Sequence, residues 1–143
     1  MSADWPRRIA SLGGVGHLRP GPGTWGSAVV LPLALLPGWA LALAALGFTL
    51  AGFWALARLP EAEKDPSWVV VDEAAGMALA LVFAQGLLGV VLAFALFRLF
   101  DIVKWGPVGW ADRQPGAFGV MADDLIAGAM AAGLVLLFHA VVA

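Results

Sequence analysis

Residues 72–104 read DEAAGMALALVFAQGLLGVVLAFALFRLFDIVK, and the way this segment folds determines the arrangement of the whole chain. It begins with two adjacent acids, continues through residues 74–97 without a charged side chain, and ends in three charges spaced three residues apart. The uncharged run is long enough for one helix of the about 20 residues that cross a bilayer core of about 30 Å. Gln85-Gly86 interrupts the run, so two shorter helices that return to the same side are the alternative.

The charges at the two ends of this segment distinguish the two arrangements. A single helix would place Arg98, Asp101 and Lys104 on the membrane surface opposite to Asp72 and Glu73. A hairpin that turns near Gln85-Gly86 would place all of these charges on one surface. We favour the hairpin because it unites the carboxylates, and the single helix remains the alternative.

The rest of the chain has the composition of an integral membrane protein. Of its 143 residues, 62% are hydrophobic and 13% are charged, and the mean hydropathy is +0.90. A soluble domain has about 25% charged residues, and a chain this short buries too little surface to hide so much apolar area. The net charge of −2 favours no class of partner, and we expect no nucleic-acid partner. The absence of cysteine excludes disulfides, thiolate nucleophiles and cysteine-based metal sites.

We therefore predict an all-α integral membrane protein with a single membrane-embedded domain over residues 1–143 and about four to five membrane-embedded helices. The first of these is expected to be short or broken, because Pro32 and Pro37-Gly38 interrupt it. The N-terminal residues lack the features of a signal peptide, so the apolar segments are expected to stay in the mature protein. The predicted membrane segments are roughly 25–36, 39–58, 70–84, 87–104 and 124–142. Residues 59–67 and 105–122 are predicted loops, and residues 1–24 are predicted to form a loop or a short re-entrant element.

Two acidic pairs lie next to apolar runs. Asp72-Glu73 precedes the helix expected from Ala74, and Asp123-Asp124 precedes the helix expected from Leu125. Acidic residues are favourable at helix N-termini because they cap free N–H groups and complement the helix dipole. Capping alone would therefore explain either pair, and a capping carboxylate could also be held in place for a metal ion.

Asp101 favours the metal interpretation. It shares one helix surface with Arg98 and Lys104, and an ion ladder would explain this spacing. Ionised groups next to hydrocarbon are costly, however, and are usually functional. Carboxylate oxygens suit Mg²⁺, Mn²⁺ or Ca²⁺, and Mg²⁺ commonly binds through carboxylates together with a substrate phosphate. The candidate catalytic and metal-binding residues are Asp72, Glu73, Asp101, Asp123 and Asp124.

A phosphate group also needs cationic side chains and hydrogen-bond donors. Arg98, Lys104 and Arg19 are the candidate cations. Thr24 and Ser27 follow a Gly-Pro-Gly sequence at the start of a predicted helix, which is a natural anion site. A turn with Thr24 as the N-cap residue explains the same sequence without a ligand. His139 is interpreted as an interfacial residue near the end of the last helix.

Three stretches taken together carry a family resemblance. They are PGTWGS at 22–27, VVDEAAGM at 70–77, and FRLFDIVK at 97–104 with its continuation to GVMADDLIAG at 119–128. In their order and spacing, from about residue 11 to 133, the chain resembles the phosphatidylglycerophosphatase A family. These bacterial membrane enzymes remove the terminal phosphate of phosphatidylglycerophosphate to give phosphatidylglycerol.

The resemblance implies a Mg²⁺-dependent phosphoric monoester hydrolase of phospholipid biosynthesis in the bacterial cytoplasmic (inner) membrane. Its partners would be the phospholipid substrate and membrane lipids, and an oligomer is left open. The active face is predicted to be cytoplasmic because the Lys and Arg residues near the segment ends can all lie on that side in the hairpin arrangement. The five acids named above fall on the acidic motif positions of the family, and Arg98 and Lys104 on its basic positions. Two loop positions depart from the family pattern: Trp105 replaces a usual proline, and Ala117 replaces the second glycine of a pair.

Two interpretations without catalysis remain as alternatives. A small ion or proton transporter would place its acids in mid-membrane, whereas both pairs are expected at segment ends. A structural membrane subunit would use the acids only as caps. Within the enzyme interpretation, direct attack by water and a covalent route through an aspartate, Thr24 or Ser27 are both open.

Overall fold

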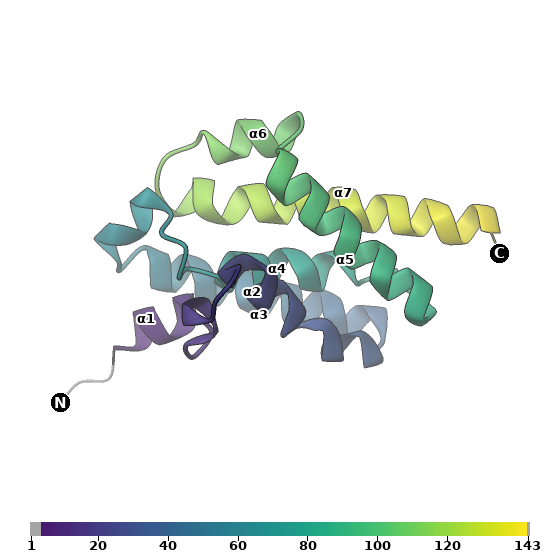
Figure 1. Ribbon diagram of the computed structural model, residues 1–143, viewed down its shortest axis with the longest axis horizontal. Helices are drawn as coiled ribbons and strands as arrows, with labels where there is room; N and C mark the ends of the chain where they lie inside the picture. The colour runs from purple at the N-terminus through teal and green to yellow at the C-terminus, as the bar shows by residue number, and fades with distance from the viewer. Residues whose placement is uncertain (1–3, 143) are drawn as a thin grey trace.

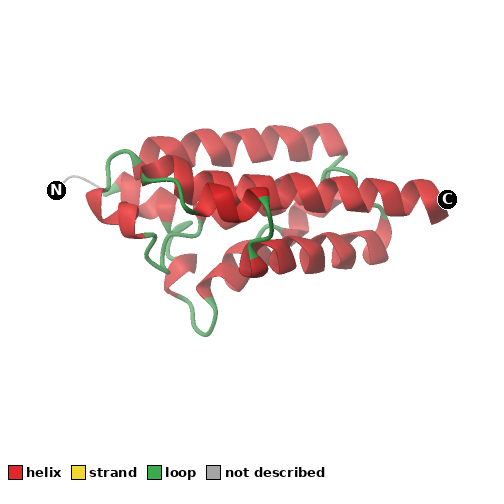
Figure 2. Ribbon diagram, turned by 90° about the horizontal axis from the view of Figure 1, so that it is seen from above, coloured by secondary structure: helices red, strands yellow, loops and turns green. Residues whose placement is uncertain are grey.

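A computed structural model describes residues 4–142, apart from the side chain of Glu63, and every regular element in these residues is helical. No strand occurs in this range, so the predicted all-α class is confirmed. Long helices lie roughly along one axis, and shorter helices gather toward the N-terminal end (Figures 1 and 2). The α-helices are α1 (Trp5–Ala10), α2 (Pro22–Ala28), α3 (Gly38–Leu56), α4 (Val71–Ala80), α5 (Gly86–Val103), α6 (Pro107–Asp112) and α7 (Gly116–Val142), and the 3-10 helices are η1 (Val15–His17), η2 (Leu31–Leu35) and η3 (Pro60–Lys64).

Three of the described helices, α3, α5 and α7, are long and apolar enough to cross a membrane. The segment Pro22–Leu35, which contains α2 and η2, is a shorter apolar stretch. Helix α4 has ten residues and is about 15 Å long, too short to cross a bilayer alone. These features support a membrane protein with three candidate spans, and membrane entry of the shorter segments stays a prediction.

Helix α4 lies at the centre of the molecule and packs against α3 on one side and α7 on another. Most of its residues are buried and half are alanine or glycine, which lets neighbouring backbones approach closely. A Cβ atom on Gly76 would lie 2.4 Å from the carbonyl oxygen of Asp124, and one on Gly128 would lie 2.3 Å from the carbonyl oxygen of Gly76. Two glycines therefore allow the close crossing of α4 and α7.

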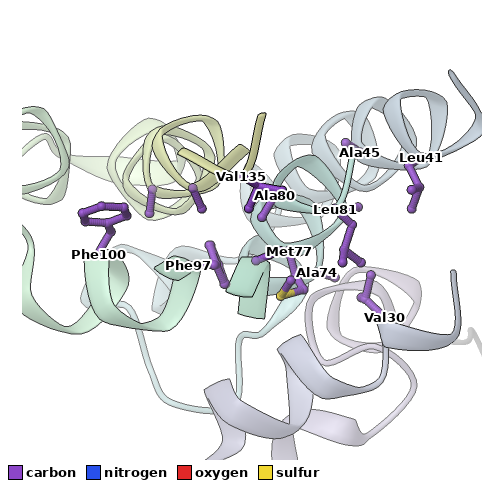
Figure 3. Close-up of a cluster of buried hydrophobic side chains, with 14 of the residues drawn as sticks. Val30, Leu41, Ala45, Ala74, Met77, Ala80, Leu81, Phe97, Phe100 and Val135 are labelled. Carbon is purple, nitrogen blue, oxygen red and sulfur yellow. The ribbon is translucent and has the colours of Figure 1, made fainter. Parts of the chain in front are cut away.

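The hydrophobic core surrounds α4 and joins it to the long helices. Met77 of α4 and Leu81, which caps its C-terminus, belong to one cluster with Phe97 of α5 and Val135 of α7, and all four side chains are fully buried (Figure 3). Leu41 of α3 belongs to the same cluster. This packing fixes the position of the first turn of α4 relative to α5 and α7.

Helices α4 and α5 form the predicted hairpin. The chain leaves α4 after Ala80 and begins α5 at Gly86, whose φ of +67° suits glycine. The backbone N–H of Gln85 donates to Nε2 of His139 over 3.0 Å, which ties this turn to the far end of α7. The prediction of a break near Gln85-Gly86 is confirmed, and the single long helix is excluded.

The predicted loops contain more helix than the sequence suggested. Residues 105–122 include α6 and the first turns of α7, so the expected helix start at residue 124 is wrong. Residues 1–24 contain α1 and the start of α2, and residues 59–67 contain η3. The reason is that proline lies in the first turn of α1, α2, α6 and η3. Proline is favourable there because its missing N–H has no helical partner and its φ angle is already helical.

Candidate active site

Three acids from two helices meet in the interior. Asp72 of α4 and Asp123 and Asp124 of α7 each offer one carboxylate oxygen, and these three oxygens lie within 4.8 Å of one another. The residues are only 4%, 3% and 1% exposed, respectively. The close glycine crossing of α4 and α7 brings them together. This convergence makes the group a candidate site for a metal ion.

Several carboxylate oxygens in this region lack a hydrogen-bond partner. Asp72 Oδ1, Glu73 Oε2 and Asp124 Oδ1 are buried and unpaired among the described residues. A buried anion without a partner is strongly unfavourable. A divalent cation would satisfy these oxygens, and an all-oxygen donor set suits Mg²⁺, Mn²⁺ or Ca²⁺. The side chains present therefore fit the metal expected from the sequence.

Glu73 and Arg98 face the start of α2 at the edge of the acidic group. A Cβ atom on Gly23 would lie 3.0 Å from Glu73 Oε1 and 3.3 Å from Arg98 Nη1. Glycine at position 23 thus lets the α2 backbone pass close to both groups. Arg98 Nη1 also lies 2.5 Å from Asp101 Oδ2, which holds the guanidinium group in place.

Lys104 links α5 to α6 and α7. Its Nζ atom lies 2.9 Å from Asp123 Oδ2, 3.7 Å from Asp101 Oδ1 and 3.5 Å from Asp112 Oδ1. Lys104 ends α5 in a left-handed conformation with φ of 58°. One ammonium group is therefore shared among three carboxylates, and it partly neutralises the acidic group from one side.

The five predicted acids lie in one region of the structure, but the predicted phosphate ligands do not all lie beside them. Thr24 is exposed in the first turn of α2. Ser27 is fully buried, and its hydroxyl donates to the carbonyl oxygen of Gly23 over 2.9 Å. Arg19 is exposed in the segment before α2, and none of the described polar contacts joins it to the acids. Arg98 is the predicted phosphate ligand that lies beside both the acids and the α2 backbone.

The two acidic pairs do not have the same relation to their helices. Asp72 and Glu73 lie in the first turn of α4, as the sequence suggested. Asp123 and Asp124 lie about two turns inside α7, so the capping interpretation of this pair is wrong. Helix α7 begins at Gly116, and Gly119 in its first turns has no room for a side chain, since a Cβ atom there would lie 1.9 Å from the carbonyl oxygen of Gln114. A sequence without its fold does not show this contact.

Two further acids near the site were not predicted from the sequence. Asp112 at the end of α6 pairs with Lys104, because α6 folds back against α7. Asp65 lies in the loop before α4, where partial burial and the nearby charge of Asp72 raise the pKa of its carboxyl to about 7. Both residues lie in polar segments, and the spacing of their neighbours gives no signal that would separate them from ordinary loop acids.

Together, these features define a helical protein with candidate membrane spans and a buried carboxylate site, flanked by Arg98 and Lys104, that could hold a divalent cation. The family model of phosphatidylglycerophosphatase A matches residues 8–139. The chain therefore belongs to the phosphatidylglycerophosphatase A family, and this membership indicates a phosphatase.

Three curated relatives are similar to the chain. Phosphatidylglycerophosphatase A of Haemophilus influenzae is 34% identical over 135 residues, covering 85% of this chain and 82% of the relative. Phosphatidylglycerophosphatase A of Escherichia coli is 30% identical over 122 residues, covering 79% and 71%. A Bacteroides thetaiotaomicron protein provisionally named phosphatidylinositol-3-phosphatase is 42% identical over 95 residues, covering 63% of this chain and 60% of that protein's length. No solved structure matches the chain.

Family membership also bears on the transporter alternative. The sequence predicts both acidic pairs at segment ends, which disfavours an ion pathway. In the structure only Asp72 and Glu73 lie at a helix start, because Asp123 and Asp124 lie inside α7. The family match and the two relatives named phosphatidylglycerophosphatase A now carry the preference for an enzyme.

Proposed function

We propose that the protein hydrolyses phosphatidylglycerophosphate to phosphatidylglycerol and inorganic phosphate in a Mg²⁺-dependent reaction at the cytoplasmic face of the bacterial inner membrane. The observation that carries the proposal is the set of buried, unpaired carboxylate oxygens beside Arg98. The choice of lipid rests on the two relatives that align with most of the chain and share that name.

Asp72, Asp123 and Asp124 would hold the magnesium ion, since one oxygen of each lies within 4.8 Å of the other two. When bound, Mg²⁺ would neutralise charge on the phosphate and so favour attack by water. Lys104 is already shared by three carboxylates, so its proposed main task is to orient Asp123. Asp101 orients Arg98 in the same way.

Arg98 is the proposed ligand of the substrate phosphate. Its guanidinium group can donate two parallel hydrogen bonds to phosphate oxygens. Its position beside Gly23 leaves the α2 backbone close enough to border the bound phosphate. Phosphate binding at this point would bring the phosphorus atom next to the acids rather than to the exposed Arg19.

Glu73 is the proposed general base. Its Oε2 atom is unpaired, and its Oε1 atom faces the same space as Arg98. Water would add to phosphorus while the bond from phosphorus to the glycerol oxygen breaks. Glu73 would take a proton from the water and return it to the departing glycerol oxygen, which yields phosphatidylglycerol and inorganic phosphate. The buried hydroxyl of Ser27 is occupied by the carbonyl oxygen of Gly23, which disfavours a covalent route through this residue.

Phosphate release by the purified protein tests the proposal. The substrates are phosphatidylglycerophosphate and phosphatidylinositol 3-phosphate, each with Mg²⁺ and with a chelator. We expect wild type to release phosphate from phosphatidylglycerophosphate only with Mg²⁺, and Asp124→Asn to be inactive. Asp4→Asn is the matched control, because Asp4 is an exposed residue that caps α1 and asparagine also caps well.

Two results would contradict the proposal. Equal release by wild type and Asp124→Asn would remove the metal-site assignment. Faster release from phosphatidylinositol 3-phosphate would move the substrate preference toward the name of the Bacteroides relative.

A further inference from the structure

A large apolar groove of about 810 Å³ lies away from the acids, between the α2–η2 segment and the start of α5. Ala28, Leu31 and Leu35 line one wall, and Ala84, Leu87 and Val90 line the other. Every lining residue is alanine, leucine, valine, proline or glycine. The groove therefore offers no polar side chain to a ligand.

The groove arises from the short helical elements and the small side chains that form its walls. Helix α2 ends at Ala28, and the chain continues through the short 3-10 helix η2, which contains Pro32. Segment α2–η2 and helix α5 both pack against the central helix α4. Small side chains at Ala28, Ala34 and Ala84 leave the space between these walls unfilled.

The same two elements lead from the groove to the acidic site. On α2, Gly23 lies beside Glu73 and Arg98, and Ala28 follows about 7.5 Å further along the helix axis. On α5, Arg98 lies about 12 Å from Val90 along the axis. The near end of the groove thus lies next to Ala28 and Val90, and the far end lies at Leu35 and Leu87.

The far end of the groove opens to the surroundings of the molecule. Leu35 is 93% exposed and Leu87 is 81% exposed. Leu87 lies in the candidate membrane span α5 and Leu35 lies in the shorter apolar segment Pro22–Leu35, so their surroundings are expected to be lipid. The acyl chains of a phospholipid whose headgroup lies at the acidic site would extend into the hydrocarbon region. The groove runs in the same direction, from its near end to its far end.

We infer that this groove binds one acyl chain of the phospholipid whose phosphate lies at Arg98. The inference rests on the proposed function, since it assumes a lipid phosphate at that end. Lipid tails are as apolar as leucine, so the groove gains little affinity from burying a chain. Its effect is to orient the substrate, which brings the phosphate to the acids in a reactive position.

Matched tryptophan substitutions on α5 test the groove directly. Leu87 lines its far end, whereas Leu88 is 64% exposed and does not line it. Leu87→Trp should lower kcat/KM about tenfold for long-chain phosphatidylglycerophosphate, because the larger side chain blocks the end of the chain. The same variant should leave a short-chain substrate unaffected, and Leu88→Trp should leave both substrates unaffected. Equal slowing by the two variants, or slowing by neither, would overturn the inference.

A labelling experiment separates failure of the groove from failure of the proposed function. Wild type is reconstituted in vesicles that contain a phospholipid with a photoreactive group near the end of one acyl chain. We expect label within residues 86–90, which is reduced in Leu87→Trp and retained in Leu88→Trp. If wild type releases no phosphate from any lipid, the proposed function fails, and this labelling still decides whether a chain occupies the groove. Label that is absent from the groove, or a cross-link to a second copy of the protein in its place, would overturn the inference.

Discussion

The two acidic pairs look alike in the sequence but lie in different physical settings. Asp72 and Glu73 lie in the first turn of α4, where the helix dipole stabilises a negative charge by about 0.3–1 kcal/mol. Asp123 and Asp124 lie well inside α7, beyond the reach of that effect. Asp123 has Lys104 as a partner, whereas Asp124 Oδ1 has none among the described residues. Within the α7 pair, Asp124 is therefore the residue whose burial depends most on what the site binds, because neither Lys104 nor the helix dipole compensates its charge.

The largest expected effect comes from removing the charge of Asp124. Removing a group that only supports a metal ligand already lowers metal affinity or activity by about 10–100-fold. Removing the ligand itself, in Asp124→Asn, should therefore lower phosphate release by more than about 100-fold. The same variant should be more stable than wild type in a chelator, because it removes an unpaired buried charge. Phosphate assays and tryptophan fluorescence during heating measure the two effects.

Asp72→Asn sharpens this comparison. It should lose activity to a similar extent, but its gain in stability should be smaller, because it also gives up the favourable helix dipole. A variant Asp124→Asn that is less stable than wild type in a chelator would show that this carboxylate is satisfied without a metal.

The second prediction concerns the crossing that brings the two pairs together. Gly128→Ala would place a Cβ atom 2.3 Å from the carbonyl oxygen of Gly76, so α4 and α7 must move apart. We expect a loss of about 1–3 kcal/mol in stability and a strong loss of activity. Gly133→Ala is the matched control on the same helix, since its Cβ atom would meet nothing within 4 Å. Equal stability and equal activity of the Gly128→Ala and Gly133→Ala variants would contradict the proposal that the close crossing of α4 and α7 assembles the acidic site.

The third prediction concerns the partner that only the α7 pair has. Lys104→Met removes the ammonium group shared by Asp101, Asp112 and Asp123. Activity should fall about 10–100-fold, because Asp123 loses the contact that orients it. Lys104→Arg keeps the charge and should recover part of the activity. A titration with Mg²⁺ for each variant measures this, and equal activity of Lys104→Met and wild type would exclude the orienting role.

The smallest effect is expected at the end of the molecule away from the acids. His139→Ala removes the acceptor of the Gln85 N–H, so stability should fall by about 0.5–1.5 kcal/mol while activity is kept. Leu137→Ala serves as the control at an exposed position of α7. A large loss of activity in His139→Ala, with stability unchanged, would show that the two ends are not independent.

The sequence was sufficient for the features that depend on charge and hydropathy. The long uncharged run with Gln85-Gly86 at its middle allowed either one helix or a hairpin, and the charges at its two ends favoured the hairpin, which the structure confirms. These inferences succeeded because an ionised group next to hydrocarbon strongly restricts where a chain can turn.

The predictions that failed concern features that depend on how neighbouring helices pack together. Gly116 and Gly119 suggested a loop, but α7 includes both residues and packs against α6. The pairing of Asp112 with Lys104 arises only when α6 folds back against α7. Local composition does not contain this information, so the interior position of Asp123 and Asp124 became visible only in the structure.

Metal binding tests most directly whether the two acidic pairs form one site. Mn²⁺ can replace Mg²⁺ in an all-oxygen site, and its binding is followed by electron paramagnetic resonance of the protein in lipid nanodiscs. We expect wild type and the Asp4→Asn control to bind Mn²⁺ tightly and in competition with Mg²⁺, and both Asp72→Asn and Asp124→Asn to lose this binding. Unchanged Mn²⁺ affinity in either site variant would contradict a metal site shared between α4 and α7.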